Sequence, residues 1–221
     1  AFIMDGNGRW AQKKGLARLK GHSEGTATVK RVIEDLKNHG VKVATFYAFS
    51  TENWKRSTEE VSGLFDLMRL WFRKELNEII AKGVRIRFIG NRTDGKLAPD
   101  ILSLMEEVEA RTAHLSTITA IFAINYSGRD ELTRAAQKSA QTGQPLQECL
   151  DTAGYPDPDL VIRTSGEQRL SNFLLWQLAY AELYFTDVSW PDFSSTHLQA
   201  ALSSFLTRQR RFGAVPATPA A

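Results

Sequence analysis

Short apolar segments rich in β-forming residues alternate with segments of helical periodicity along the whole chain. This alternation is typical of strand–helix–strand units, in which parallel strands form one sheet and the connecting helices cover its faces. The sequence therefore predicts a single α/β domain with a mainly parallel sheet of about six strands wrapped by helices. In one strand Arg85 and Arg87 alternate with apolar residues, which indicates a position near a sheet edge. The strands that can be placed are 2–4, 41–49, 84–88, 117–124 and 160–163.

Capping residues and glycines mark the predicted helix boundaries. The sequence Ser57-Thr58-Glu59-Glu60 has the pattern of a capping box and predicts the start of a long helix. Gly83 is placed to end that helix after Lys82. The other predicted helices contain 29–36, ended by Gly40, then 99–114, a helix after Ser127 and a helix from Asn172.

Length and composition limit the class of protein. The chain has 221 residues, 43% of them hydrophobic and 24% charged, which suits one domain with a sizeable core. No apolar stretch approaches the ~18 to 20 residues needed to cross a bilayer. Cys149 is the only cysteine, which excludes an internal disulfide and fits a reducing cytoplasm. No targeting peptide is visible, but the absence of an initiator methionine leads us to expect further residues before Ala1.

The segment from Arg163 to Asn172 carries more cationic donors than a fold needs locally. It contains Arg163, Arg169 and Ser171, and it lies between the apolar runs 160–162 and 173–176. We therefore expect a loop at the carboxyl end of a strand, opening a helix, where open α/β sheets bind anions. Guanidinium groups offer paired, planar donors that match phosphate, so the segment predicts a ligand with several phosphate oxygens. The alternative is a set of surface arginines in ordinary ion pairs.

A glycine-bearing loop follows the first predicted strand. Gly6, Gly8 and Ala11 formally match the dinucleotide-binding pattern G-x-G-x-x-A. We reject an oxidoreductase, because Asp5 at the strand end would repel a pyrophosphate unless a cation intervened. A carboxylate, exposed glycine N–H groups and the charge of Arg9 instead suit a diphosphate bound with Mg²⁺. Taken alone, the loop is more simply explained as a tight turn.

Several motifs, in order along the chain, resemble those of the cis-prenyltransferases, most closely the bacterial members that make undecaprenyl diphosphate. The resemblance covers nearly the whole chain and is weakest from Gln137 to Pro158. Ser165 stands where many bacterial members have glycine, which puts the loop geometry in question but removes no cationic donor. The motifs are MDGNGRWA at 4–11, GH at 21–22, YAFSTENW at 47–54, NY at 125–126, GR at 128–129, RTSGEQRLSN at 163–172 with FLLWQ after it, YAELYF at 180–185 and RQRRFG at 208–213.

The resemblance implies a transferase that adds isopentenyl diphosphate to an allylic diphosphate such as farnesyl diphosphate. Each condensation would form a cis double bond and release pyrophosphate, giving undecaprenyl diphosphate for the lipid carrier of cell-wall synthesis. The implied cofactor is Mg²⁺, with Asp5 and Glu182 as metal ligands and Asp5 assisting departure of the diphosphate. Within the family, short-chain cis-farnesyl and longer dehydrodolichyl-type synthases remain as alternatives.

The residues that match the family's site form three groups. The catalytic group is Asp5, Asn7, His22, Ser50 and Asn53. The group implied to bind the allylic diphosphate is Gly6, Gly8, Arg9, Trp10, Arg18, His22, Trp54 and Arg56. The group implied to bind isopentenyl diphosphate is Arg163, Arg169, Ser171, Arg211 and Gly213. For His22 a structural hydrogen-bonding role is an equal alternative.

The predicted helix 58–82 is more apolar than packing against one sheet requires. Beyond one broad apolar face it also carries Leu67, Leu70 and Trp71, which favours a lipid tunnel, a dimer contact or plain core. Ala48 is small, so a tunnel wall at that position leaves room for a long chain. The segment 173–181 is apolar almost all round and predicts a buried helix.

The resemblance also implies a butterfly-like fold with an apolar tunnel and a homodimer in which 211–213 of one subunit reach the partner's isopentenyl site. We expect a catalytic domain over 1–213 and a loose tail over 214–221. The expected location is the cytoplasm, with peripheral contact at the membrane that receives the lipid product.

Two other classes of function fit part of the sequence. A non-catalytic family subunit would keep the fold, but Asp5, Asn7, Arg163, Arg169 and Glu182 together argue against it, since binding alone needs no metal ligand. A nucleic-acid-binding module fits the pI of about 9.0. The sequence shows no recognition helix or aromatic stacking platform, and the net charge of +3 demands no polyanion, so no nucleic-acid partner is expected.

Overall fold

The computed structural model describes residues 1–209, which form one sheet of six strands. The strand order is β3-β4-β2-β1-β5-β6 and every neighbouring pair is parallel. The predicted α/β class with a parallel sheet of six strands is confirmed, although the sequence did not place the sixth strand. The strands are β1 (Phe2–Ile3), β2 (Val43–Ser50), β3 (Val84–Ile89), β4 (Ile118–Tyr126), β5 (Leu160–Arg163) and β6 (Glu182–Phe185).

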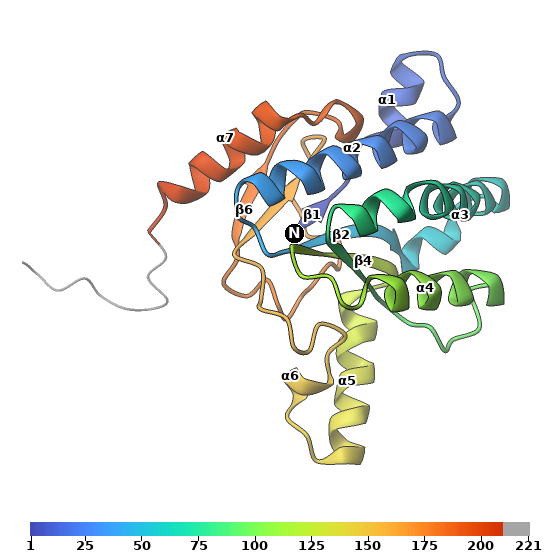
Figure 1. Ribbon diagram of the computed structural model, residues 1–221, viewed down its shortest axis with the longest axis vertical. Helices are drawn as coiled ribbons and strands as arrows, with labels where there is room; N and C mark the ends of the chain where they lie inside the picture. The colour runs from blue at the N-terminus through green and yellow to red at the C-terminus, as the bar shows by residue number, and fades with distance from the viewer. Residues whose placement is uncertain (210–221) are drawn as a thin grey trace, which may run out of the picture.

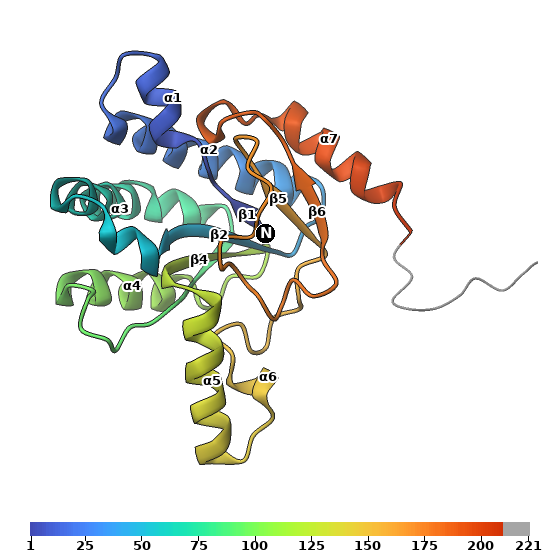
Figure 2. The same ribbon diagram turned by 180° about the vertical axis from the view of Figure 1, so that it is seen from behind.

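Helices cover mainly one face of the sheet. There α2, α3 and α4 lie side by side, with α7 beside α2, while α5 and α6 project away from the sheet (Figures 1 and 2). The predicted alternation of strands and helices is confirmed, but α1, α6 and α7 were not predicted. The helices are α1 (Asn7–Lys13), α2 (Arg18–Asn38), α3 (Thr58–Ala81), α4 (Pro99–Thr112), α5 (Gly128–Thr142), α6 (Leu146–Cys149) and α7 (Ser195–Leu206), with 3₁₀ turns η1 (Thr51–Lys55) and η2 (Trp190–Asp192).

Aromatic residues from neighbouring strands form the centre of the core under the helices. Phe46 of β2 stacks on Phe2 of β1 and on Phe122 of β4, with ring centroids 5.2 and 5.4 Å apart. The parallel register places Phe2 and Phe122 opposite Phe46, so the stack follows from the strand pairing. At the far edge β3 pairs with β4 alone, as the alternation of Arg85 and Arg87 predicted.

The long helix α3 begins as its capping box predicts. The Ser57 hydroxyl accepts a hydrogen bond from the Glu60 backbone N–H at 3.2 Å, which satisfies one of the free N–H groups of the first turn. The helix ends at Ala81, and Gly83 follows with a φ of +73°, a conformation that glycine adopts without steric cost.

The predicted helix from Asn172 to Ala181 is wrong. Ser171, Asn172 and Leu174 have φ values of +50°, +63° and +44°, and a right-handed helix cannot contain such residues. The basic loop after β5 therefore does not open a helix. The segment 170–181 instead lies as irregular turns on the second face of the sheet, where Phe173 and Leu174 are fully buried.

The expected burial of this whole segment is also wrong. Leu175, Trp176 and Tyr180 are exposed, Trp176 to 42%.

Among the described residues, no helix is both long and apolar enough to cross a membrane.

Candidate active site

The main polar cleft lies where the carboxyl ends of β1, β2 and β5 meet. The chain leaves β1 toward β2 and later returns to the other side of β1 with β5, and open α/β sheets bind ligands at such a reversal. The cleft has a volume of about 530 Å³. Its lining residues are Ile3, Met4, Asp5, Asn7, His22, Tyr47, Ala48, Ser50, Glu52, Asn53, Arg56, Arg163, Ser171 and Asn172.

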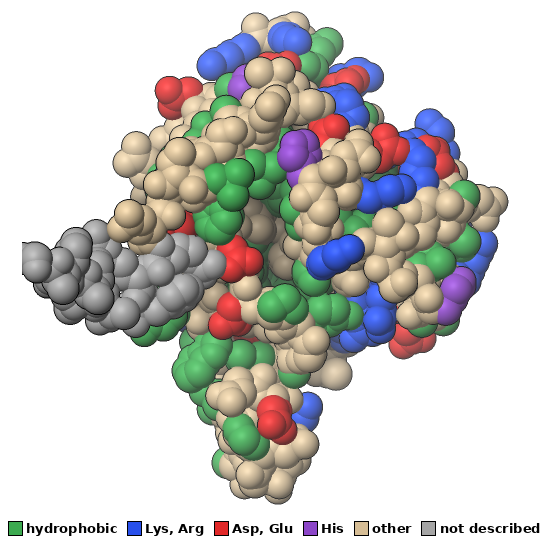
Figure 3. Space-filling view, turned by 60° about the vertical axis from the view of Figure 1, so that its left-hand side comes forward, with side chains coloured by type: hydrophobic (Ala, Val, Ile, Leu, Met, Phe, Trp, Pro, Cys, Tyr) green, Lys and Arg blue, Asp and Glu red, His purple; other side chains and the backbone are tan. Residues whose placement is uncertain are grey.

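A second hollow, of about 350 Å³, lies at the opposite end of the sheet, between the end of α2, α7 and the start of β5. Figure 3 shows that face of the molecule, hollowed near its middle, with acidic and hydrophobic side chains beside the hollow. Asp157 and Asp159 line it. Two carboxylates with Lys42 do not suit a diphosphate, so the cleft at the carboxyl ends is the candidate active site.

Asp5 and Arg163 form the centre of the cleft. The Arg163 guanidinium donates to Asp5 Oδ2 at 3.0 Å, to Ser171 Oγ at 2.7 Å and to the Arg169 carbonyl. Asp5 Oδ1 accepts a hydrogen bond from the Gly6 N–H at 2.7 Å. Burial alone would raise the pKa of Asp5, but the hydrogen bond from Arg163, the Gly6 N–H and the charge of Arg9 bring its pKa below the ordinary value. Asp5 is therefore an anion at neutral pH.

Arg163 is 4% exposed, whereas Arg169 on the same loop is 60% exposed. Glu167 joins Arg169 to Arg9 of the first loop, with N–O distances of 2.5 and 2.9 Å. The two loops that sequence reasoning assigned to different diphosphates are thus linked through one exposed carboxylate. Such an ion pair is weak, so a bound diphosphate can replace Glu167 at both arginines.

Two arginines and a histidine surround Glu60 at the start of α3. Arg18 and Arg56 contact the Glu60 carboxylate at 3.3 and 3.1 Å, and His22 Nε2 lies 3.7 Å from it. A Cβ atom on Gly8 would lie 2.8 Å from the Arg18 guanidinium carbon, so glycine at that position gives the guanidinium its space. The cluster brings together three residues of the predicted allylic group.

His22 and Asn7 have buried polar atoms that point to a ligand. Within residues 1–209, neither His22 Nε2 nor Asn7 Oδ1 has a hydrogen-bond partner, which is rare for buried polar atoms. Burial lowers the pKa of His22 to about 4, and the charge of Arg56 acts in the same direction. The ring is therefore neutral at pH 7 and able to accept a proton.

Ser50 and Asn53 hold the turn after β2 in a reciprocal pair. The Ser50 backbone N–H donates to Asn53 Oδ1 at 3.1 Å, and the Ser50 side chain accepts from the Asn53 backbone. Both residues line the cleft. Tyr47, which sequence reasoning did not assign to the site, lies beside them and donates to the Ser171 carbonyl at 3.3 Å.

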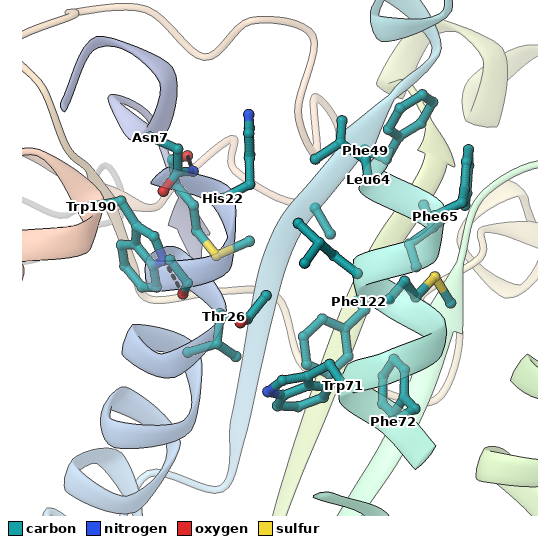
Figure 4. A pocket seen from close by; sticks show the side chains of 17 residues that line it. Asn7, His22, Thr26, Phe49, Leu64, Phe65, Trp71, Phe72, Phe122 and Trp190 are labelled. Atoms are coloured by element: carbon teal, nitrogen blue, oxygen red, sulfur yellow. Dashed lines mark hydrogen bonds between the residues drawn. The ribbon is translucent and has the colours of Figure 1, made fainter. Parts of the chain in front are cut away.

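An apolar pocket of about 130 Å³ opens directly from the cleft and lies between α2, α3 and the sheet (Figure 4). Met4, Asn7, His22 and Ala48 line both spaces. The predicted apolar tunnel thus has a counterpart in the structure. Its remaining lining residues are Gly25, Thr26, Val29, Phe49, Leu64, Phe65, Leu67, Met68, Trp71, Phe72, Phe122, Ile124 and Trp190.

Leu70 does not belong to this pocket. Leu67 and Trp71 line it as predicted, but Leu70 is 63% exposed on the outer side of α3. Neighbouring residues of a helix point about 100° apart, so these three apolar residues cannot all face one pocket.

Glu182 lies far from Asp5 in this chain. It begins β6, where it pairs with Leu160 at the amino end of β5, while Asp5 follows the carboxyl end of β1. The Glu182 carboxylate binds Arg208 at 2.8 Å. The described residues contain no group of three or more His, Cys, Asp and Glu residues that could hold a metal ion. Asp5 and Glu182 therefore do not lie together in the part of the chain that the structure describes, and their roles as metal ligands stay predictions.

Two predicted substrate-binding tryptophans have other contacts. The Trp10 indole donates to Asp192 at 2.8 Å. The Trp54 indole donates to Asn125 Oδ1 at 2.8 Å, and its ring packs against Phe49 and Phe65. Neither tryptophan lines the cleft or the pocket. The predicted roles of Arg211 and Gly213 and the predicted loose tail 214–221 lie outside the described residues.

Comparison with known proteins identifies the family. The family model described as "Putative undecaprenyl diphosphate synthase" matches residues 3–213. The chain belongs to this family. The chain is 46% identical over 225 residues to a relative from Pseudomonas aeruginosa, ditrans,polycis-undecaprenyl-diphosphate synthase ((2E,6E)-farnesyl-diphosphate specific). The match covers 96% of this chain and 89% of that protein. The chain is 45% identical to the isoprenyl transferase of Agrobacterium fabrum, covering 97% and 91%.

Solved structures agree with this assignment. Lavandulyl diphosphate synthase from Lavandula x intermedia, in complex with dimethylallyl diphosphate, matches the cis-prenyltransferase with a TM-score of 0.90 at 32% identity. A probable undecaprenyl diphosphate synthase from Campylobacter jejuni matches with a TM-score of 0.81 at 30% identity. In both comparisons 96% of each chain is covered. The predicted family, fold class and type of reaction are confirmed.

Proposed function

We propose that this chain elongates farnesyl diphosphate with isopentenyl diphosphate and releases undecaprenyl diphosphate for the cell-wall lipid carrier. The observation that carries the proposal is the continuity of a basic cleft with an apolar pocket, which share Met4, Asn7, His22 and Ala48. This arrangement fits a ligand with a diphosphate at one end and a hydrocarbon at the other. The names of the Pseudomonas relative and the Campylobacter structure support the same substrates.

We assign the two groups of cationic side chains to the two diphosphates. Arg9, Arg18 and Arg56, with the N–H groups around Gly8, would hold the allylic diphosphate. Arg163, Arg169 and Ser171 would hold isopentenyl diphosphate. Burial of Arg163 supports this assignment, because a buried guanidinium needs several acceptors and keeps a fixed orientation. The carboxylates of Glu60 and Glu167, which now contact these arginines, would give way to phosphate oxygens.

The residues present fit a magnesium ion beside Asp5. Mg²⁺ usually takes one or two carboxylates and completes its shell with waters and substrate phosphates, so an ionised Asp5 between the two cationic groups is sufficient. Bound Mg²⁺ would add positive charge to the diphosphate that departs. Asp5 itself orients Arg163, and Glu182 lies away from Asp5 in the part of the chain that the structure describes.

The condensation also needs a proton acceptor. The bond from the allylic carbon to diphosphate breaks, a bond to the terminal alkene carbon of isopentenyl diphosphate forms, and that substrate then loses a proton. His22 and Asn7 lie where the cleft meets the pocket, and their buried atoms Nε2 and Oδ1 are free of hydrogen bonds within the described chain. We assign Asn7 to orienting the substrates. Proton transfer is assigned to neutral His22 together with Ser50 and Asn53.

We also propose a homodimer and contact with the membrane. Leu175, Trp176, Tyr180 and Leu183 of the irregular segment and β6 have exposed side chains, and a second copy of the chain would cover this apolar surface. The protein would act in the cytoplasm, at the membrane that receives the product.

Product analysis tests the function. The chain is incubated with labelled isopentenyl diphosphate, farnesyl diphosphate and Mg²⁺, and the extracted lipid is sized by chromatography. Long cis-polyprenyl diphosphate supports the proposal. Products that stop after one or a few additions would identify a short-chain synthase, and binding of both diphosphates without condensation would identify a non-catalytic subunit.

A further inference from the structure

The backbone that carries Ser171 takes an uncommon conformation. Ser171, Asn172 and Leu174 have φ values of +50°, +63° and +44°, and residues with a Cβ seldom adopt this left-handed region. Each such residue costs free energy, so the conformation persists only where surrounding contacts impose it. Backbone of this kind is concentrated at binding and catalytic sites. The contacts around this turn therefore identify the groups that keep Ser171 in place.

Tyr47 of β2 contacts the turn through both its ring and its hydroxyl. The ring stacks on Phe173 with centroids 4.4 Å apart and planes at 14°, and Phe173 is fully buried. The hydroxyl donates to the carbonyls of Ser171 and Tyr126, each at 3.3 Å, so one proton is shared between two acceptors. Burial raises the pKa of Tyr47, and the hydroxyl therefore keeps this proton at neutral pH.

The neighbouring residue, Asn172, is held by other partners. Its carbonyl accepts a hydrogen bond from the Gly128 N–H at 2.7 Å, and its side-chain oxygen accepts one from the Arg129 N–H at 3.0 Å. Its side-chain amide donates to Glu52 Oε1 at 2.9 Å. These bonds tie Asn172 to the start of α5 and to the turn after β2, whereas the Ser171 carbonyl is held by the tyrosine hydroxyl.

The side chain of Ser171 connects this turn to the centre of the cleft. Ser171 Oγ accepts a hydrogen bond from the Arg163 guanidinium at 2.7 Å, and the same guanidinium donates to Asp5 at 3.0 Å. The carbonyl and the side chain of Ser171 leave the same Cα, so a contact that fixes the carbonyl also limits the direction of the side chain. Tyr47 can therefore act on the Arg163 guanidinium through Ser171.

We propose that Tyr47 is a positioning residue for isopentenyl diphosphate: its hydroxyl holds the Ser171 carbonyl and so keeps Ser171 Oγ and the Arg163 guanidinium directed at the diphosphate. The inference rests on the proposed function, which assigns Arg163 and Ser171 to this substrate. Without the hydroxyl, the turn loses the bond that holds residue 171 and can relax toward more common backbone conformations.

The first test removes the hydroxyl and keeps the ring. Tyr47→Phe preserves the stack on Phe173, so the melting temperature should change little. Affinity for isopentenyl diphosphate, measured by titration calorimetry with this diphosphate alone, should fall roughly two- to tenfold, the value of one neutral hydrogen bond. Affinity for farnesyl diphosphate should not change. Tyr155→Phe is the matched control, because Tyr155 packs against the same buried cluster but does not line the cleft.

A double-mutant cycle separates positioning from direct contact with the substrate. If Tyr47 acts through Ser171, Tyr47→Phe should cost much less affinity for isopentenyl diphosphate once Ser171→Ala has removed the hydroxyl that it positions. Additive losses would show that the Tyr47 hydroxyl contacts the substrate itself, and would overturn the inference. Unchanged affinity in Tyr47→Phe, or an equal loss for both diphosphates, would overturn it as well.

The kinetics of the condensation distinguish this inference from the proposed function. In an active chain, Tyr47→Phe should raise the KM for isopentenyl diphosphate while kcat at saturating substrate falls less. An unmodified chain that binds isopentenyl diphosphate but forms no product would overturn the proposed function, and the binding comparison would still decide the role of Tyr47. An unmodified chain that binds neither diphosphate would overturn both.

Discussion

The Arg163 guanidinium donates a hydrogen bond of 3.0 Å to the Asp5 carboxylate across the gap between β5 and β1. The pair joins residues that are 158 positions apart in the sequence, because β1 and β5 are neighbours in the sheet. Arg163 keeps Asp5 ionised and lowers its pKa against the effect of burial. Asp5 in turn fixes the direction of a guanidinium that also reaches Ser171 and the Arg169 carbonyl. A change at Arg163 should therefore disturb Asp5 as well as the site proposed for isopentenyl diphosphate.

We predict that Asp5→Ala loses most turnover while the fold and the binding of both substrates persist. Asp5 sits at a strand end, and its proposed task is charge stabilisation in the transition state, where loss of one such group costs ~10²-fold or more in kcat. Asp5→Asn should be similarly impaired, because it keeps the shape but not the charge. Asp66→Ala, an exposed carboxylate on α3, is the control. Normal kcat for Asp5→Ala at saturating Mg²⁺ would contradict the assignment.

We predict that Arg169→Ala weakens the binding of isopentenyl diphosphate by roughly 1.5 to 3 kcal/mol, the value of a lost charge-assisted contact. Binding of farnesyl diphosphate should change much less, since the proposed allylic site uses Arg9, Arg18 and Arg56. Titration calorimetry with each diphosphate measures the two affinities. Arg111→Ala on α4 serves as the control for removing an exposed arginine. An equal loss of affinity for both substrates would show that the assignment of Arg169 to the isopentenyl diphosphate site is wrong.

We predict that Arg163→Ala also weakens the binding of isopentenyl diphosphate more than that of farnesyl diphosphate. Its effects should extend beyond binding. Because Arg163 is buried and orients Asp5, its removal should also lower kcat and thermal stability. Arg163→Lys keeps the charge but loses the planar fork, so it should recover little. Recovery by lysine to normal activity would show that only the charge at this position matters.

Ser165 stands where many bacterial members of the family have glycine, and the structure shows how the serine fits there. Its φ is +75°, a region that costs a non-glycine residue about 1 to 2 kcal/mol, and its side chain packs where a Cβ on Gly6 would lie. We predict that Ser165→Gly raises the free energy of unfolding by roughly 0.5 to 1 kcal/mol, after the entropy cost of glycine. Ser103→Gly, within helix α4, should instead lower it. Chemical unfolding of both variants decides the sign.

Local patterns predicted those parts of the fold that depend on neighbouring residues. The start of α3 and the strand β5 follow from caps and apolar runs. The segment after Asn172 could not be predicted this way, because its apolar residues suggest a helix while its backbone is fixed by contacts with the sheet. Phe173 stacks on Tyr47 at 4.4 Å, a contact between residues far apart in sequence.

The same limit applies to the site. Asp5, His22 and Arg163 lie in recognisable motifs, whereas Glu60, the carboxylate that contacts Arg18 and Arg56, does not. Glu60 looked like a helix cap, and only the packing of α2 against α3 brings it to Arg18 and His22. Similarly, the apolar excess on α3 left a lipid tunnel, a dimer contact and plain core as alternatives, and only the helix orientation separates Trp71 in the pocket from exposed Leu70.

We predict that His22 makes stability depend on pH below neutrality. The pKa of His22 is about 4 in the folded chain, mainly because of burial, and 6.5 when unperturbed. The unfolded state therefore binds more protons between these values, and stability falls as the pH drops from 6.5 toward 4. His22→Gln should remove this part of the pH dependence, measured as the change in unfolding free energy between pH 7 and pH 5. His114→Gln, at an exposed site, is the control. Equal pH dependence in His22→Gln and the unmodified chain would contradict the prediction.

We predict that Ala48→Leu shortens the product. Ala48 lines both the cleft and the apolar pocket, so added methylenes at this position narrow the entrance through which the hydrocarbon must pass, and packed space accepts such bulk poorly. Both diphosphate groups remain untouched, so the first condensation should proceed at a near-normal rate while long products disappear. The measurement is the rate of single addition to farnesyl diphosphate together with the size of the final lipid. Ala48→Gly, which removes bulk at the same position, should not shorten the product. An unchanged size distribution in folded, active Ala48→Leu would show that the growing chain does not pass Ala48, and the path between α2 and α3 would then have to begin elsewhere.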